Sequence, residues 1–358
     1  MTFGLKDKYF SNTIACLGGV IVNTTTGLKN FTFVLMMVLV PAIGGAQSSG
    51  DVEGIESQFT ISPYAEVVLG STEYVLQAPG VQSRLEFPLN MLVLGLSGEY
   101  ALPSGGSEDW RFQLSAGTSL SGPWGVLKDH DWYLVEGVPP IKIIYTESDA
   151  EMLFFEARAG VEKRLFSARE AGLFGSIGYN FQYIYQDALG YNGWQYVQDS
   201  NPPADDDYVY AIGVMNSDLL ALEYTIAYHR VVAGGVLRWQ PYRSFKLELS
   251  LLPQLMYVAD RDDHVLRNKL STAAGFGGGV ESELSLTYRW QGTTDYQSYV
   301  SLTGGLLYLR AVTEQTQEWY DDDPGISGDQ TGLQYTGITH IIQTLQGSLG
   351  VSAGVWYR

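Results

Sequence analysis

Two acidic stretches of the sequence hold residue types that can carry out hydrolysis. "DRDDH" occupies 260–264 and "KDHDW" occupies 128–132, and each follows a strand-like segment. A histidine beside a carboxylate is oriented and made more basic, which suits a general base. Carboxylates on the opposite side of a cleft can hold and polarise a water molecule. The two stretches therefore indicate a hydrolytic site, provided that the fold brings them together.

Other interpretations of the same residues are a solvated acidic loop and a metal site. "DRDDH" opens like a calcium-binding loop, but Val265 and Ser271 stand where an EF-hand has Gly and Glu. The sequence also contains no HExxH zinc motif and no GxSxG nucleophile elbow. We therefore expect a site without a metal ion or a cofactor.

The segments that must position these residues show the alternation of β-strands. In "LFFEARAGVEKRLF" (153–166) the odd positions are mostly apolar, whereas the even positions include Glu156, Arg158, Glu162 and Arg164. The segments 173–185 and 280–290 repeat this pattern. A soluble sandwich would turn the apolar face inward, and a membrane barrel would turn it to lipid around a wet lumen.

The beginning of the chain favours the barrel. An apolar run followed by small residues, "FTFVLMMVLVPAIGGA" (31–46), predicts a signal peptide with an upstream prefix over 1–46 and a single domain over 47–358. Cleavage would remove Cys16, the chain's one cysteine, so disulfides and cysteine–zinc sites would be excluded. A soluble secreted β-protein is the alternative.

The charge balance indicates the kind of partner. The net charge is −18, with 21 Lys and Arg against 39 Asp and Glu. This excess of negative charge argues against a nucleic-acid partner. It favours cationic peptides or proteins, and outer-membrane lipid would surround the barrel.

We count about ten strand-like segments, which predicts an all-β fold: a ten-stranded antiparallel transmembrane barrel. They lie near 57–76, 83–101, 110–122, 150–166, 171–187, 220–239, 244–260, 269–290, 297–318 and 338–358. The connections alternate between short turns and long loops, the loops falling around 123–149, 188–218 and 319–337. Short turns face the periplasm in such barrels. Because several segments exceed the roughly 9–11 residues that span a bilayer, the barrel should extend beyond the membrane.

Strand order and side-chain parity bring the two acidic stretches together. They follow the third and seventh strands, which both run outward, so both should lie at the extracellular mouth. Asp260, Asp262 and His264 share the inward parity of the seventh strand. Asp129 and Asp131 have the inward parity of the third strand, unless a bulge near 122–123 changes the count.

Four stretches of the chain resemble the omptins, a family of outer-membrane endopeptidases built on ten-stranded barrels. "DHDW" is similar to the family's Asp-x-Asp-Trp, and "DRDDH" to its Asp-x-Asp-x-His. "SRLEF" (83–87) resembles a strand-two stretch, and "TEYVL" (72–76) a Glu-bearing stretch near the first loop. The order and spacing hold over nearly the whole mature chain.

The resemblance implies an aspartic-type endopeptidase that cleaves beside basic residues. Asp129 and Asp131 would hold a water opposite an Asp262–His264 dyad, and His264 would take its proton. Substrate-binding residues are expected among the acids: Glu73 and Glu147 as the acidic floor for a basic P1 side chain, and Asp260 beside the dyad.

The chain departs from the omptins at their lipopolysaccharide-binding stretch. The family has Tyr-x-Glu-x-Arg on the outer face of strand five, whereas this chain has Tyr179, Asn180, Phe181, Gln182 and Tyr183. A lipopolysaccharide requirement is therefore in doubt. Two other functions stay open: an inert omptin-fold surface adhesin that binds cationic proteins, and a small-solute channel.

Overall fold

The computed structural model describes residues 58–104, 107–120, 122, 124–197, 209–290, 296–324 and 328–357. The predicted signal peptide over 1–46 and the aspartate run at 205–207 lie outside the described residues. In the described part of the chain, no helix is long and apolar enough to cross a membrane.

The described chain consists almost entirely of strands. These are β1 (Gln58–Ala78), β2 (Val81–Pro88), β3 (Met91–Ser104), β4 (Ser107–Ser119), β5 (Val126–Tyr133), β6 (Ile141–Ala168), β7 (Ala171–Val197), β8 (Val209–Tyr242), β9 (Phe245–His264), β10 (Lys269–Trp290), β11 (Tyr296–Trp319) and β12 (Gln334–Tyr357). One short 3₁₀ turn, η1 (Val265–Arg267), connects β9 to β10.

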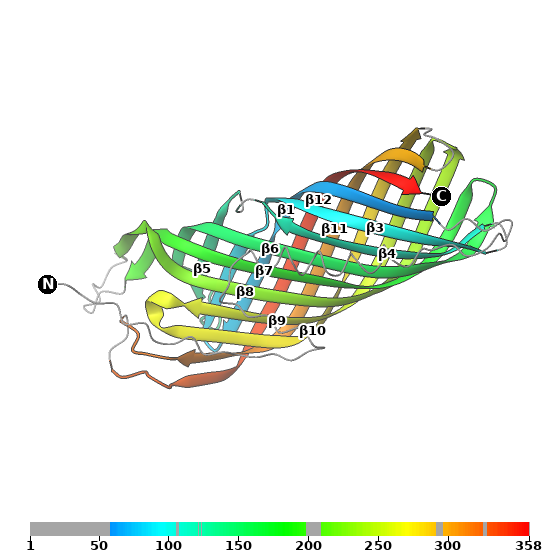
Figure 1. Ribbon diagram of the computed structural model, residues 1–358. Coiled ribbons are helices and arrows are strands. Elements are labelled where there is room, and N and C mark those ends of the chain that lie inside the picture. Colours follow the sequence, from blue (N-terminus) through cyan, green and yellow to red (C-terminus); the bar gives the residue numbers. More distant parts are fainter. Residues whose placement is uncertain are drawn as a thin grey trace. The chain divides into compact units, whose positions relative to one another are not determined.

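The strands form one antiparallel sheet that closes on itself (Figure 1). β1 pairs with β12 along 59–77, which closes the ring. β2 and β3 lie end to end along β1, and β4 and β5 lie end to end along β6. Each of these two pairs therefore acts as one interrupted strand, and the ring has ten positions. The predicted ten-stranded barrel is confirmed.

The strands extend further than predicted. β6, β7 and β8 have 28, 27 and 34 residues. Much of 123–149 and 188–218, which we predicted as loops, is therefore strand. Beyond a lipid-facing region both faces of a strand meet water, so the alternation that reveals a strand disappears there.

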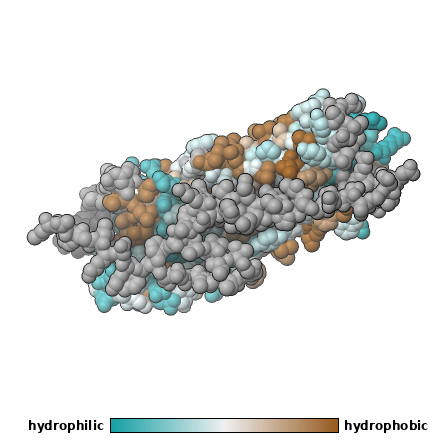
Figure 2. All heavy atoms as spheres, viewed as in Figure 1, coloured by the Kyte–Doolittle hydropathy of each residue, from teal (hydrophilic) through white to brown (hydrophobic). Residues whose placement is uncertain are grey.

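The outer face carries an apolar band with aromatic side chains near its edges. We call the end of the barrel opposite the short turns the long-strand end. Toward this end, outward-facing rings on neighbouring strands contact one another across β6–β10. Their centroids are 6.2 Å apart for Phe155–Phe181, 5.1 Å for Phe181–His229, 6.1 Å for His229–Tyr257 and 5.4 Å for Tyr257–Phe276. Near the other end Trp239, Tyr288 and Trp290 are exposed. Apolar residues appear as brown patches on the visible face in Figure 2. Such a band with aromatic borders is typical of transmembrane barrels.

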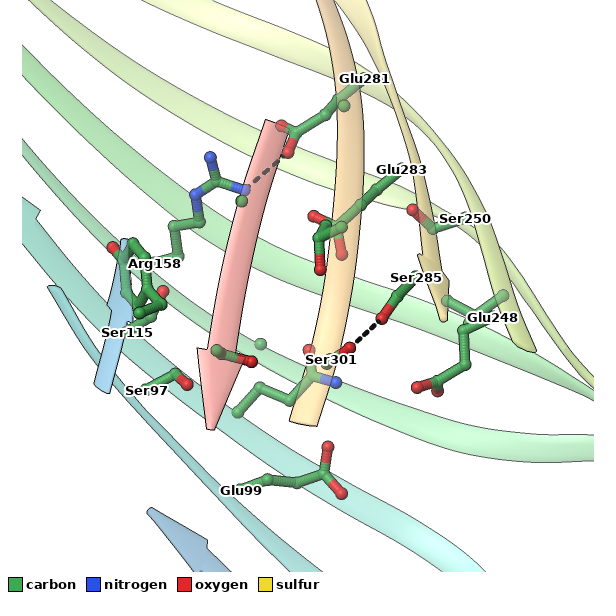
Figure 3. Close-up of a pocket in the computed structure, with 18 of the residues that line it drawn as sticks. Ser97, Glu99, Ser115, Arg158, Glu248, Ser250, Glu281, Glu283, Ser285 and Ser301 are labelled. Carbon is green, nitrogen blue, oxygen red and sulfur yellow. Dashed lines mark hydrogen bonds and ion pairs between the residues drawn. The ribbon is translucent and has the colours of Figure 1, made fainter. Parts of the chain in front are cut away.

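Charged side chains line the lumen near the short turns. A cavity of about 360 Å³ lies there, with Glu66, Glu281 and Glu283 on its wall. Figure 3 shows Arg158 pointing toward Glu281 from the opposite side, and their closest N–O distance is 2.8 Å. Arg238 pairs with Glu162 and Glu248 deeper toward the turns. Opposite charges from different strands therefore pair inside the lumen.

A hydrophobic plug fills the middle of the lumen. It contains side chains from most strands, none more than 6% exposed, among them Val68, Phe87, Met91, Phe154, Ile184, Ile226, Met256, Leu309 and Ile342. The plug separates the charged cavity from the residues beyond it at the long-strand end. Packed apolar side chains leave little room for water, so the lumen is divided into two wet regions.

Two glycines make room for a large side chain just below the plug. A Cβ at Gly95 or Gly117 would lie within 2.4 Å of the Tyr64 ring or hydroxyl. Tyr64 donates a hydrogen bond to Glu156 across the lumen, at 3.1 Å. The glycines on β3 and β4 therefore allow a β1 ring to cross the barrel interior.

Candidate active site

The carboxylate–histidine pair lies at the outer end of β9. Asp262 is 1% exposed, and its Oδ2 lies 3.0 Å from His264 Nε2. Burial alone would raise the pKa of Asp262. The charge and hydrogen bond of His264, with a further bond from Tyr74, outweigh burial and hold this pKa below its ordinary value. Asp262 is therefore an ionised acceptor that can orient the imidazole.

The second pair of carboxylates lies on β5. Asp129 pairs in register with the buried Leu85 of β2, and Asp131 pairs with Ser83, so both aspartates take inward positions. The interruption between β4 and β5 falls where we expected a possible bulge, and it leaves the inward parity intact.

The electrostatics show that the two pairs face one another. Burial, followed by the negative charges of Asp131 and Asp262, raises the pKa of Asp129 to about 8. Burial also raises the pKa of Asp131, which a Ser83 hydrogen bond and the charge of His264 oppose. Carboxyl groups on β5 and β9 thus act on each other across the lumen. They lie farther from the short turns than the outward aromatic rings of β6–β10.

Several oxygens of this cleft are left without a protein partner. Asp129 Oδ1, Asp131 Oδ1 and Asp262 Oδ1 are buried and have no hydrogen-bond partner among the described residues. Buried acceptors of this kind are normally satisfied by water or a ligand. The cleft is therefore built to take up donors such as a water molecule.

Tyr74 is a site residue that our sequence analysis missed. It is fully buried on β1, and its hydroxyl donates to Asp262 Oδ2. The signal was present in the sequence, because the even positions Thr60, Ser62 and Tyr64 face the lumen on the same strand.

The structure does not bring Glu73 and Glu147 into the cleft. Glu73 stands between the buried Thr72 and Tyr74, so it faces outward. Glu147 pairs in register with Lys128 and accepts a hydrogen bond from Tyr145 on the outer face. The prediction that these two acids form the floor for a basic P1 side chain is wrong in its geometry, because alternation turns both away from the lumen.

Asp260 and Asp263 take the sides that parity predicted. Asp260 faces inward, is 7% exposed, and its Oδ2 lies 3.7 Å from His340 Nε2. Asp263 faces outward, where it contacts Arg261 and Tyr320, each at 3.0 Å. Of the three acids expected to bind substrate, only Asp260 lies beside the dyad.

A buried lysine also belongs to the cleft. Lys269 is 7% exposed and begins β10, in register with His264 on one side and Trp319 on the other. Burial, then the neighbouring charge of Arg267, lowers the pKa of Lys269 to about 8, and the charges of the site aspartates oppose that change. Its odd parity matches the inward Glu281 of the same strand, so the sequence carried this signal as well.

Together these features define a ten-stranded barrel of outer-membrane type with a carboxylate–histidine cleft at its long-strand end. No protein-family model and no curated protein sequence matches the chain. Among solved structures it is similar to the outer membrane protease OmpT from Escherichia coli, with a TM-score of 0.62 and 14% identity, covering 85% of this chain and 99% of that one. The likeness establishes an omptin-like barrel fold.

Other barrels match less well. The translocator domain of the autotransporter NalP from Neisseria meningitidis has a TM-score of 0.33 and 10% identity, covering 92% of this chain and 96% of that one. The transport unit of the autotransporter AIDA-I from Escherichia coli has a TM-score of 0.29 and 10% identity, covering 90% and 97%.

Proposed function

We propose that the protein is an outer-membrane endopeptidase whose cleft faces the outside of the cell. The observation that carries the proposal is the Asp262–His264 pair facing Asp129 and Asp131, whose unpartnered oxygens suit a bound water. The apolar outer band supports membrane insertion, and the short turns at the opposite end support the orientation.

The geometry supports direct attack by water. A water held by Asp129 and Asp131 attacks the scissile carbonyl carbon and gives a proton to the ring nitrogen of His264 that does not contact Asp262. A C–O bond forms, and the carbonyl oxygen becomes an oxyanion. When the intermediate collapses, the C–N bond breaks and the leaving amine takes the proton from His264. No acyl-enzyme forms, and Asp262 stabilises the imidazolium.

Cationic peptides are the proposed substrates, drawn by the net charge of −18. Because Glu73 and Glu147 face outward, Asp260 is the one expected substrate-binding acid left to favour cleavage beside Lys or Arg. We expect activity without lipopolysaccharide: the outward residues on β7 are Tyr179, Phe181 and Tyr183, while Asn180 and Gln182 are buried in the lumen.

Refolded protein incubated with a mixture of fluorogenic peptides, with and without lipopolysaccharide, tests the proposal. Cleavage within the peptide chain, followed by mass spectrometry of both fragments, is the expected result. If the wild-type protein binds cationic peptides but cuts none of them, the adhesin function takes its place. The hydrophobic plug supports the protease and adhesin functions over the channel.

A further inference from the structure

The cleft contains a buried cation of its own, Lys269. Lys269 is buried on the inward face of β10, next to His264 and Trp319 in register, and its Nζ lies 5.8 Å from the centroid of the Trp319 ring. A flexible lysine at the end of a strand would normally extend into water. Its burial in this cleft therefore needs opposite charges nearby.

Those charges are the site aspartates. The titratable groups that act on Lys269 come from three elements: Asp129 and Asp131 on β5, Asp262 on β9, and Arg267 on η1. Arg267 is itself engaged, because its Nε donates to the buried Asp323 at 3.1 Å. Lys269 is thus a buried cation in register with His264, and its charge acts on the carboxylates of the cleft.

We propose that Lys269 is a specificity-determining residue, a resident cation that neutralises the cleft and frees it from needing a basic P1 residue. The proposal rests on the proposed endopeptidase function. It joins two observations: the buried lysine stands in register with the histidine of the dyad, and Glu73 and Glu147, the acids expected to receive a basic side chain, face the outside of the barrel. A site that already holds a positive charge gains less from a positive substrate.

Matched peptides with Arg or citrulline at P1 test this directly, because citrulline has the same shape as arginine and no charge. We expect the wild-type kcat/KM values for the two peptides to agree within about tenfold, since substrate charge then contributes little. In Lys269→Met the ratio should move toward Arg by about tenfold or more, and in Lys269→Arg it should stay at the wild-type value. Lys128→Met, which removes an outward lysine one residue from Asp129, is the control and should leave the ratio unchanged.

The pH profile gives a second readout. The positive charge of Lys269 is present below its pKa of about 8 and is lost as the pH rises through that value. The wild-type ratio of kcat/KM values should therefore move toward the Arg peptide above about pH 8. In Lys269→Arg the movement should be smaller, because arginine stays charged and only the ionisation of Asp129 changes the charge of the cleft over this range. A wild-type ratio of about a hundredfold in favour of Arg, or a ratio that Lys269→Met does not change, would overturn the proposal.

Binding separates this inference from the function on which it rests. Fluorescence anisotropy of the two labelled peptides can be measured on protein carrying His264→Ala, with and without Lys269→Met. Tighter binding of the Arg peptide in the double variant, with citrulline binding unchanged, supports the resident cation even if no peptide is cut. If the Arg peptide binds equally well with and without Lys269→Met, the resident-cation proposal is contradicted, whatever the activity of the wild-type protein.

Discussion

At the scale of single residues, the dyad makes the strongest prediction. His264→Ala should lower the rate of peptide cleavage by about two orders of magnitude or more, because a positioned base commonly contributes on the order of 10²–10⁴-fold. Initial rates on a peptide that the wild-type protein cuts provide the measurement. Asp263→Asn is the matched control, since its side chain contacts Arg261 and Tyr320 on the outer face. Full activity in His264→Ala would rule out the dyad mechanism.

Asp129 should respond differently to two substitutions. Its pKa of about 8 means that it holds a proton at neutral pH, so the amide of Asp129→Asn imitates the protonated form better than Asp129→Ala does. We expect both variants to be slower than wild type and the Asn variant to retain about tenfold more activity than the Ala variant. Equal rates for the two would show that the polar group at this position does not contribute.

The same carboxyl group should make stability depend on pH. Its pKa is raised in the folded protein from an ordinary 3.8, so the folded state binds the proton more tightly than the unfolded state between about pH 4 and 8. Stability is therefore lost as the pH rises through this range. Asp129→Asn should unfold at a higher temperature than wild type at about pH 9 and show little difference at about pH 4. A difference that does not depend on pH would contradict the assignment.

Parity explains which site residues could be predicted from the sequence. Asp129, Asp131, Asp262 and His264 take the inward positions that parity predicts, because the apolar residues of the preceding strand segments alternate. Glu73 is acidic and lies in a stretch that resembles the omptins, but the alternation of its own strand turns it outward. An acidic residue type alone does not place a side chain in the lumen, because strand geometry decides which side it faces.

At the scale of elements, the crossing of Tyr64 over β3 and β4 makes a packing prediction. Gly95→Val should lower the unfolding temperature and the refolded yield, since even a Cβ at Gly95 would overlap the tyrosine ring. Gel mobility of unheated samples after a temperature series measures this, because folded barrels resist detergent. Tyr64→Ala combined with Gly95→Val should recover part of the loss. An additive loss in the double variant would mean that the two residues do not compete for space.

Strand ends could not be predicted as well as strand centres. The centres of β6–β9 alternate because one face meets apolar surroundings and the other meets charged lumen groups. Near Glu147 or Asp187 this contrast is gone, and only backbone pairing with neighbouring strands keeps the chain extended. Such pairing depends on partners far away in the sequence, so a local pattern cannot reveal it.

At the scale of the whole molecule, the hydrophobic plug predicts a barrel that does not conduct. Reconstituted protein in planar bilayers should show no large, stable single-channel currents, because ions would have to cross a layer of packed, buried side chains. A porin measured in the same bilayers serves as the positive control. Steady currents with uniform step size would instead favour the channel function.

The plug also decides which solution each half of the lumen meets. In the proposed orientation, the cleft residues exchange protons with the medium outside the cell, while the charged cavity around Arg158 and Glu281 lies on the periplasmic side. A change in the external pH would then titrate Asp129 and Asp131, whose pKa values burial raises, without reaching the ion pairs of the charged cavity. The rate of peptide cleavage would then depend on the external pH, whereas the ion pairs of the charged cavity would depend on the pH of the periplasm.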